Sequence, residues 1–461
     1  MFYNPPPSVK QFCRGLGRRA GLSRPHQFLL CVFVAGTLLS RGKRSLAVLG
    51  RTVGRATRYR GQLSRATRNP DFRTRDVYKV AFDDALTEET TAIEGKAAKR
   101  TWIVTLDDVG TKRGGLTKIE NGLHKRKAKK NPGAKQTPPS KSHTFVMGLL
   151  ITDRGARLPL PRKTWRTRKY ARKIGKKYRK KPVLAAEMLR ELKPRIPAGV
   201  RVVVVADEAY EGKFLFSVCR ELGFGLITPV DSRRCFGDVA KGDTSTERTL
   251  HARGEALPRS AFRRLVLARG KESTVSFRRY TPDEIRRDEP RTFRVAHEAR
   301  DVAGLGIVGV VYSWKSPVYR PRRDRKRETF KVLVCSDSSM SPEEVVELYD
   351  LRWQVELFFR ELKSGLGLGS YTGTDFAAYE RLVDLTLLSF LFLERRRLTG
   401  LASARAPVVR AALGTSRTAT LKRDVEREAA ANDLAWLRAS VDTGRGRRRL
   451  REMLKALRPA I

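Results

Sequence analysis

RVVVVADEAY, residues 201–210, is a near-continuous apolar run that ends in acidic residues. A strand buried on both faces of a sheet has this pattern, because neighbouring elements cover both of its sides. Helical spacing precedes it in KPVLAAEMLRELKPRI (181–196) and follows it in EGKFLFSVCRELG (211–223), which stops at a glycine. FGLITPVD (224–231) then has the composition of another strand. The centre of the chain is therefore predicted to be an α/β unit.

Three further strands are predicted upstream of this unit. They are TWIVTLDDVG (101–110), HTFVMGLLITDRG (143–155) and the short ARLPLPRKTW (156–165). The predicted order is β-β-β-α-β-α-β, a mixed sheet flanked by helices. In such a sheet the first and fourth strands can be neighbours, so that residues at their ends converge.

The pattern changes after Asp231. Short β-like pieces follow up to about residue 338: STVSFRRY, RTFRVAHEA, GIVGVVYSW and FKVLVCSDS. They predict a β-rich insertion of about a hundred residues. SPEE (341–344) then begins a helix, with Ser341 as N-cap, Pro342 at the first helical position and Glu344 completing a capping box. An apolar helix and a basic helical C-terminal segment come after it.

Charge dominates the composition. The chain has 461 residues, and 96 Lys and Arg against 48 Asp and Glu give a formal net charge of +48. This charge favours a polyanionic partner, and double-stranded DNA is the one we expect. None of the five cysteines forms a CxxC pair, so we expect free thiols in a reducing cytoplasm and neither a zinc site nor a disulfide framework. FLLCVFVAGTLL (28–39) is too short to span a bilayer, and we expect a buried helix rather than a signal peptide or membrane contact.

Two basic regions are candidates for DNA binding. The first 70 residues contain 14 Lys or Arg and no acid. An apolar helix (about 24–40) is followed there by two predicted short helices, on which Arg51 and Arg55 are candidate phosphate contacts. The run 162–181 has 12 basic residues and interleaved aromatics. Its candidate contacts are Arg166, Lys169, Lys173 and Lys177.

The stretch YDLRWQVELFFRELKSGLGLGSY (349–371) contains a polar stripe. At about 100° per residue, Tyr349, Arg352, Glu356 and Lys363 fall within roughly 60° of one another on a regular helix. Glu347 and Glu361 lie off this stripe, and we expect them to face solvent.

Three acids occupy comparable places in the predicted fold. Asp108 ends the first strand, Asp207 ends the fourth, and Glu356 lies on the later helix. Converging carboxylates repel one another unless cations neutralise them, and their hard oxygens suit Mg²⁺ or Mn²⁺. Two such ions can activate a nucleophile and stabilise a leaving oxygen in phosphoryl transfer. Asp107 is the alternative to Asp108, because adjacent strand residues face opposite ways, and Glu208 is the alternative to Asp207.

These residues resemble the DDE transposases of bacterial insertion sequences, which have a ribonuclease H-like catalytic core. Tyr349, Arg352, Glu356 and Lys363 keep the spacing of the Tyr-Arg-Glu-Lys signature of one large branch, and LDDVGTKRGG and VVVVADEAY resemble its two aspartate motifs. Val109 departs from the family, which usually has a threonine there. The resemblance implies that Asp108, Asp207 and Glu356 are catalytic metal ligands, that Arg352 and Lys363 hold phosphates, and that Tyr349 assists at the terminal phosphate.

The sequence patterns predict a division of the chain, and the resemblance implies an activity. We expect a helical DNA-binding region (1–80), a core in two parts (81–232 and 339–400), the β-rich insertion (233–338) and a helical C-terminal region (401–461). The expected activity is cleavage of transposon ends and their joining to target DNA by a homodimer on the bacterial nucleoid. A domesticated DDE-type nuclease and a non-catalytic DNA-binding protein are the alternatives.

Overall fold

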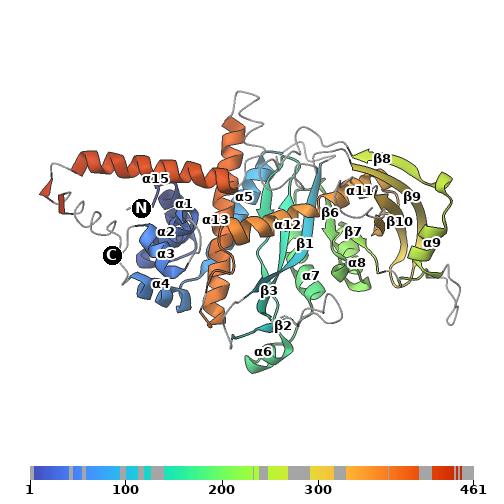
Figure 1. Ribbon diagram of the computed structural model, residues 1–461, viewed down its shortest axis with the longest axis horizontal. Helices are drawn as coiled ribbons and strands as arrows, with labels where there is room; N and C mark the ends of the chain where they lie inside the picture. Colours follow the sequence, from blue (N-terminus) through green and yellow to red (C-terminus); the bar gives the residue numbers. More distant parts are fainter. Residues whose placement is uncertain are drawn as a thin grey trace, which may run out of the picture.

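In the computed structural model the described residues are 5–40, 45–53, 59–93, 100–112, 119–125, 140–231, 233–237, 248–267, 291–315, 329–371, 373–403, 418–440, 443–444 and 447–448. They form a mixed α/β structure with a helical N-terminal region and a central mixed sheet (Figure 1). Arg55 and the predicted strand STVSFRRY lie outside the described residues.

The N-terminal region is a cluster of helices around one buried helix. The helices are α1 (Pro7–Arg19), α2 (Arg24–Leu39), α3 (Leu46–Thr52), α4 (Tyr59–Arg68) and α5 (Thr74–Thr91). Every residue of α2 from Leu30 to Leu39 is buried, as the sequence predicted, and α2 packs against α1, α3 and the long helix α13 (Phe376–Ser403). Among the described helices none is long and apolar enough to cross a membrane.

The central sheet contains the predicted strands, although the third is divided in two and an additional short strand precedes the second. Its core strands are β1 (Thr101–Lys112), β3 (Ser140–Ile151), β6 (Arg201–Ala206) and β7 (Gly225–Pro229). β1 pairs antiparallel with β3 and parallel with β6, and β6 pairs parallel with β7. The shorter strands β2 (Leu123–Lys125), β4 (Arg157–Pro159) and β5 (Lys163–Thr164) all pair with β3.

Each face of this sheet is covered by its own helices. Val203 and Val205 pack with Ile103 and with α11 (Pro342–Asp350) on one face. Val202 and Val204 belong to the larger core on the other face, which also contains α7 (Lys181–Leu192) and α8 (Lys213–Leu222). The second of these helices ends at Gly223, whose φ of 68° is the left-handed conformation that glycine adopts readily. The valine run is thus apolar because both of its sides are buried.

The strands between Asp231 and Ser341 extend this sheet. They are β8 (Arg263–Leu267), β9 (Arg291–Val302), β10 (Gly306–Lys315) and β11 (Thr329–Cys335), with the short helix α9 (Leu250–Ala256) beside them. β11 pairs antiparallel with β7, and the order continues through β10 and β9 to β8. The insertion strands therefore lie at one end of the continuous sheet (Figure 1, right).

The segment after the insertion is not the single regular helix that the stripe assumed. Ser341 caps α11 by accepting a hydrogen bond from the Glu344 amide at 3.2 Å, as predicted. α11 ends at Asp350, where the amides of Leu351 and Arg352 donate to carbonyls only three residues back and tighten the chain into a turn. α12 (Trp353–Arg360) follows, and then a π-helical turn, η6 (Glu361–Gly365). The spacing of 100° per residue therefore fails at both ends of α12.

Buried ion pairs attach this segment to α13. The guanidinium of Arg157 in β4 lies 3.2 Å from Glu394 of α13 and 3.4 Å from Glu361 of η6. The sequence predicted that Glu361 faces solvent, and this prediction is wrong, because Glu361 faces inward to Arg157. Glu347 is exposed, as expected. α13 stands between the N-terminal helices and the sheet (Figure 1), and α15 (Thr418–Ser440) packs against it.

Replacement of Arg157 by methionine tests this attachment. The change removes one of the two guanidinium partners of the Glu394 carboxylate, which is only 1% exposed and keeps Arg397, and breaking a buried pair costs up to about 3–5 kcal/mol. We therefore expect Arg157→Met to lower the free energy of unfolding strongly, measured by urea denaturation followed by circular dichroism.

The matched control is Arg190→Met, which breaks the exposed pair with Glu221 at 2.8 Å. Exposed pairs contribute about 0–1 kcal/mol, so this variant should unfold close to the wild type. Equal losses in the two variants would contradict a specific role for the buried network.

Candidate functional site

Two aspartates meet at one edge of the sheet. β1 and β6 are parallel, and their last paired residues are Leu106 and Ala206. Asp107 and Asp207 come next in each strand, so they lie at the same level, and both are half-buried. The carboxyl ends of adjacent parallel strands thus bring two acids together, as the sequence predicted for the first and fourth strands.

The alternation of side chains separates Asp107 from Asp108. Asp107 continues the face of Ile103, which packs with α11. Asp108 continues the opposite face, where its Oδ2 lies 2.8 Å from Nζ of Lys181, the first residue of α7. The structure therefore brings Asp107, the alternative, to the face of α11, while Asp108 is paired on the other side.

The pKa of Asp107 reflects this position. Desolvation is the largest cause that raises it, to about 6 from an ordinary 3.8. The carboxylates of Asp108 and Asp207 raise it further, whereas the Asp108 amide, which donates to Oδ1 at 2.6 Å, and Arg352 lower it. The group carries a like-charge penalty that a bound cation would relieve.

Arg352 links this edge to the later helix. Its guanidinium lies 2.6 Å from Glu356 Oε1 and 3.9 Å from Asp107 Oδ2. Tyr349 is its third neighbour, and burial, above all other causes, raises the pKa of this phenol to about 12. Two members of the predicted stripe, Tyr349 and Glu356, therefore lie beside Arg352, which in turn reaches Asp107. Lys363 is exposed and lies beyond them in η6, where the π-helical turn alters the spacing.

Lys331 also lies beside these side chains, and nothing in the sequence singled it out. It lies on β11, and its Nζ is 5.4 Å from the centroid of the Tyr349 ring. The ammonium of Lys331 interacts electrostatically with four charged side chains, those of Arg352, Asp207, Glu356 and Glu208. A basic residue in a predicted β-rich insertion has no local signal for this role, because the pairing of β11 with β7 alone brings it here.

The donor chemistry at this edge suits a divalent cation. The acids are oxygen donors, and burial, followed by the neighbouring carboxylates, raises the pKa of Asp107. Among the described residues no three His, Cys, Asp or Glu side chains are gathered closely enough to hold a metal ion. The guanidinium of Arg352 lies between two of the acids, since it reaches both Asp107 and Glu356.

The basic run 162–181 divides into a structural half and an exposed half. Arg162 is buried against Asp384 at 2.8 Å, Lys163 pairs with Glu191, and Arg166 lies 3.6 Å from Glu380. The second half contains α6 (Arg168–Lys173), and here the predicted contacts are exposed. Those residues are Lys169, Lys173 and Lys177. In the N-terminal region Arg51 is exposed on α3.

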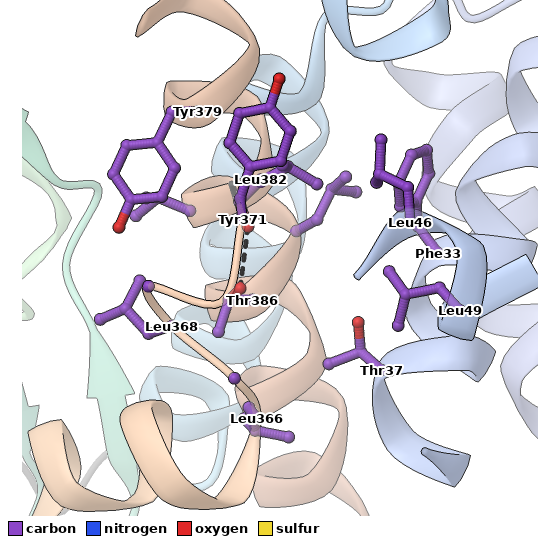
Figure 2. A pocket seen from close by; sticks show the side chains of 14 residues that line it. Phe33, Thr37, Leu46, Leu49, Leu366, Leu368, Tyr371, Tyr379, Leu382 and Thr386 are labelled. Carbon is purple, nitrogen blue, oxygen red and sulfur yellow. Dashed lines mark hydrogen bonds between the residues drawn. The ribbon is translucent and has the colours of Figure 1, made fainter. Parts of the chain in front are cut away.

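A small apolar cavity lies between the N-terminal helices, α13 and the loop that follows η6 (Figure 2). Its volume is about 30 Å³, room for about one water, so it is a packing defect rather than a substrate site. Phe33, Leu49, Leu368 and Leu382 are among its lining residues. A more open cavity of about 350 Å³ lies where the end of α2, η6 and α15 meet, and Lys422 lines it.

Comparison with known proteins identifies part of the chain. The family model described as the transposase DDE domain matches residues 171–392. This range contains Asp207, Lys331, Arg352 and Glu356 and begins after Asp107 and Asp108. No curated protein matches the chain.

The raised pKa of Asp107 predicts a pH-dependent effect on stability. An acid whose folded pKa exceeds its unfolded pKa destabilises the fold above the folded value, about 6 here, and the penalty fades as the pH falls towards 4. Asp107→Asn should therefore raise the free energy of unfolding at pH 8 by up to about 2–3 kcal/mol and leave it unchanged near pH 4. Denaturation in EDTA at both pH values measures this difference.

Asp108→Asn is the matched control, one residue away on the other face. It removes the charge that pairs with Lys181, so no gain at pH 8 is expected. A gain for Asp108→Asn with none for Asp107→Asn would reverse the assignment of the two faces.

Proposed function

Because the chain belongs to the DDE transposase family, we propose that it binds the ends of a mobile DNA element, cleaves them and joins them to target DNA. The observation that supports this most is the meeting of Asp107 and Asp207 beside the Arg352–Glu356 pair. The reaction is phosphoryl transfer, for which a bound divalent cation would supply activation of the attacking oxygen and stabilisation of the leaving one. Mg²⁺ or Mn²⁺, as a pair of ions, is the cofactor that we propose.

The chain's own residues divide the remaining work. Asp107, Asp207 and Glu356 would hold the cations, with Asp107 in the place for which the sequence favoured Asp108. Arg352 suits a phosphate of the transposon end because its planar guanidinium can donate two parallel hydrogen bonds. Lys363 supplies a point charge to the same DNA strand, and Tyr349 assists at its terminal phosphate.

The partners follow from this chemistry. Two ends must be joined, so we propose a homodimer that bridges them on DNA. The exposed basic side chains of α3 and α6 contact phosphates of the duplex outside the cleavage site. All five cysteines are free thiols, which supports a reducing cytoplasm, where the protein meets the nucleoid.

Substitution of the acids tests the assignment of the site. Asp107→Asn, Asp207→Asn and Glu356→Gln should each lower cleavage of a labelled end in Mg²⁺ by about 100-fold or more, the scale of losing one preorganised electrostatic group. Binding of the end, measured by gel shift, should change little. Asp108→Asn should retain cleavage. If Asp108→Asn lost cleavage and Asp107→Asn cleaved normally, Asp108 would be the metal ligand instead of Asp107.

A thermal shift with added Mg²⁺ gives a second readout, independent of turnover. A ligand that binds only the folded state raises the melting temperature. The rise should be present in the wild type and in Asp108→Asn and be reduced in Asp107→Asn.

The same assays separate the alternative functions. Cleavage without joining of the end to a target plasmid would identify a DDE-type nuclease. End binding without metal-dependent cleavage by the wild type would identify a non-catalytic DNA-binding protein.

The division of the basic run predicts opposite effects of two sets of substitutions. The triple variant Lys169→Ala, Lys173→Ala and Lys177→Ala should fold normally and bind DNA more weakly. Its slope of log K against log salt should be shallower by about 2.7, or about 0.9 for each lost phosphate contact. Arg166→Ala should instead lower the melting temperature, because Arg166 pairs with Glu380. An unchanged salt slope in the triple variant would exclude α6 from the DNA interface.

A further inference from the structure

The position of Lys331 is set by the sheet. β11 pairs antiparallel with β7, with Leu333 opposite Pro229, the last residue of β7. Lys331 lies two residues earlier on β11 and therefore just beyond the carboxyl end of β7. That is the same edge of the sheet at which β1 and β6 deliver Asp107 and Asp207.

The side chain of Lys331 lies on the face of the acids. Leu333 and Cys335, which share its side of β11, pack with Val203, Val205 and Ile227 in the cluster under α11. Val332 and Val334 belong to the core on the opposite face. Alternation thus brings Lys331 to the face of Asp107, and its contact with Tyr349 of α11 agrees with this.

Lys331 is free to bind an anion, whereas Arg352 is already paired with a carboxylate. Arg352 is engaged by Glu356 at 2.6 Å, whereas Lys331 forms no ion pair within the described part of the chain. Its contact is the face of the Tyr349 ring, which holds an ammonium without neutralising it. The residue as a whole is exposed to solvent, although neighbouring atoms desolvate its ammonium.

We propose that Lys331, carried into the site by the insertion, binds a backbone phosphate of the DNA strand that is cut. This inference rests on the proposed function. A strand that brings its scissile phosphate to Asp107 and Asp207 must lay adjacent phosphates over the neighbouring surface, and Lys331 with Tyr349 forms that surface. A lysine suits such a contact because its ammonium is a compact charge on a flexible stem. The insertion then contributes to substrate binding as well as to the sheet.

The rival explanation is structural. Lys331 could serve only to balance Asp207, Glu208 and Glu356, which act on its charge. In that case its loss would alter stability and affect all DNA phosphates equally. A phosphate contact would make the effect specific to one position in the DNA.

Chemical removal of single phosphate charges distinguishes these explanations. The probe is a labelled duplex from the DNA that flanks the gene, carrying one neutral methylphosphonate at a time across the cleaved strand. Affinity is measured by gel shift and, in Mg²⁺, single-turnover cleavage is measured in parallel. The variants are Lys331→Met, the conservative Lys331→Arg, and Lys213→Met.

Lys213 is the matched control because it is an exposed lysine at the start of α8, on the opposite face of the sheet. With unmodified DNA, Lys331→Met should lose about 10- to 100-fold in cleavage or affinity, the scale for a hydrogen bond to a charged group. Lys331→Arg should recover most of this loss, and Lys213→Met should stay within about 2-fold of the wild type, as expected for an exposed charge far from the site.

The methylphosphonate scan decides the matter. At one or two neighbouring positions the neutral linkage should weaken the wild type and Lys213→Met by a similar factor and leave Lys331→Met unaffected. Equal sensitivity of Lys331→Met and the wild type at every position would overturn the proposal, and so would a loss in Lys331→Met that merely follows a lower melting temperature.

The binding arm keeps this test separate from the proposed function. A wild type that binds DNA but does not cut it would contradict the transposase chemistry, while the scan would still reveal or exclude a contact with Lys331. A wild type that binds none of the duplexes would overturn both.

Discussion

The parallel pairing of β1 with β6 is the constraint on which the site depends. It sets Leu106 against Ala206, and the two aspartates that follow are then forced to one level at one sheet edge. A shift of one residue in this register would turn every side chain of the strand to the other face. The valines of β6 oppose such a shift, because alternate members are buried in different clusters. Apolar packing thus maintains the approach of two charges that repel each other.

The fold could be predicted where a buried element has a recognisably apolar sequence. The valine run, the apolar helix α2 and the stop of α8 at Gly223 all follow from local physics, because each depends on nearby residues alone. The strand order followed from the same segments. No residue signals the break between α11 and α12, since Leu351 and Arg352 are both compatible with a helix. Only the hydrogen bonds to Leu348 and Tyr349 reveal the turn.

The sequence predicted the sheet edge at which the aspartates meet, but it could not tell which face Asp107 and Asp108 each take, and the reason is geometric. Two adjacent acids at a strand end present the same chemistry to any sequence pattern, and the face on which α11 packs decides between them. The position of Lys331 could not be predicted from the sequence, because its contact with Tyr349 depends on the pairing of β11 with β7, which are separated by the whole insertion. Glu361 shows the converse error. A charged residue off the stripe reads as solvated until Arg157 is seen beside it.

The net charge of +48 also hides how the charges are used. Arg157 and Arg162 are buried against Glu394 and Asp384, and such pairs contribute more to the placement of elements than to net stability. They tie β4, α13 and η6 together behind the site. Lys422 of α15 extends this principle, since its ammonium lies 3.1 Å from the carbonyl of Ser40 and 3.2 Å from that of Gly365. These carbonyls end α2 and η6, where the partial negative charge of a helix favours a cation. One lysine therefore joins the N-terminal helices to the segment that follows Glu356, so neither can shift relative to the other without breaking a buried, charged hydrogen bond.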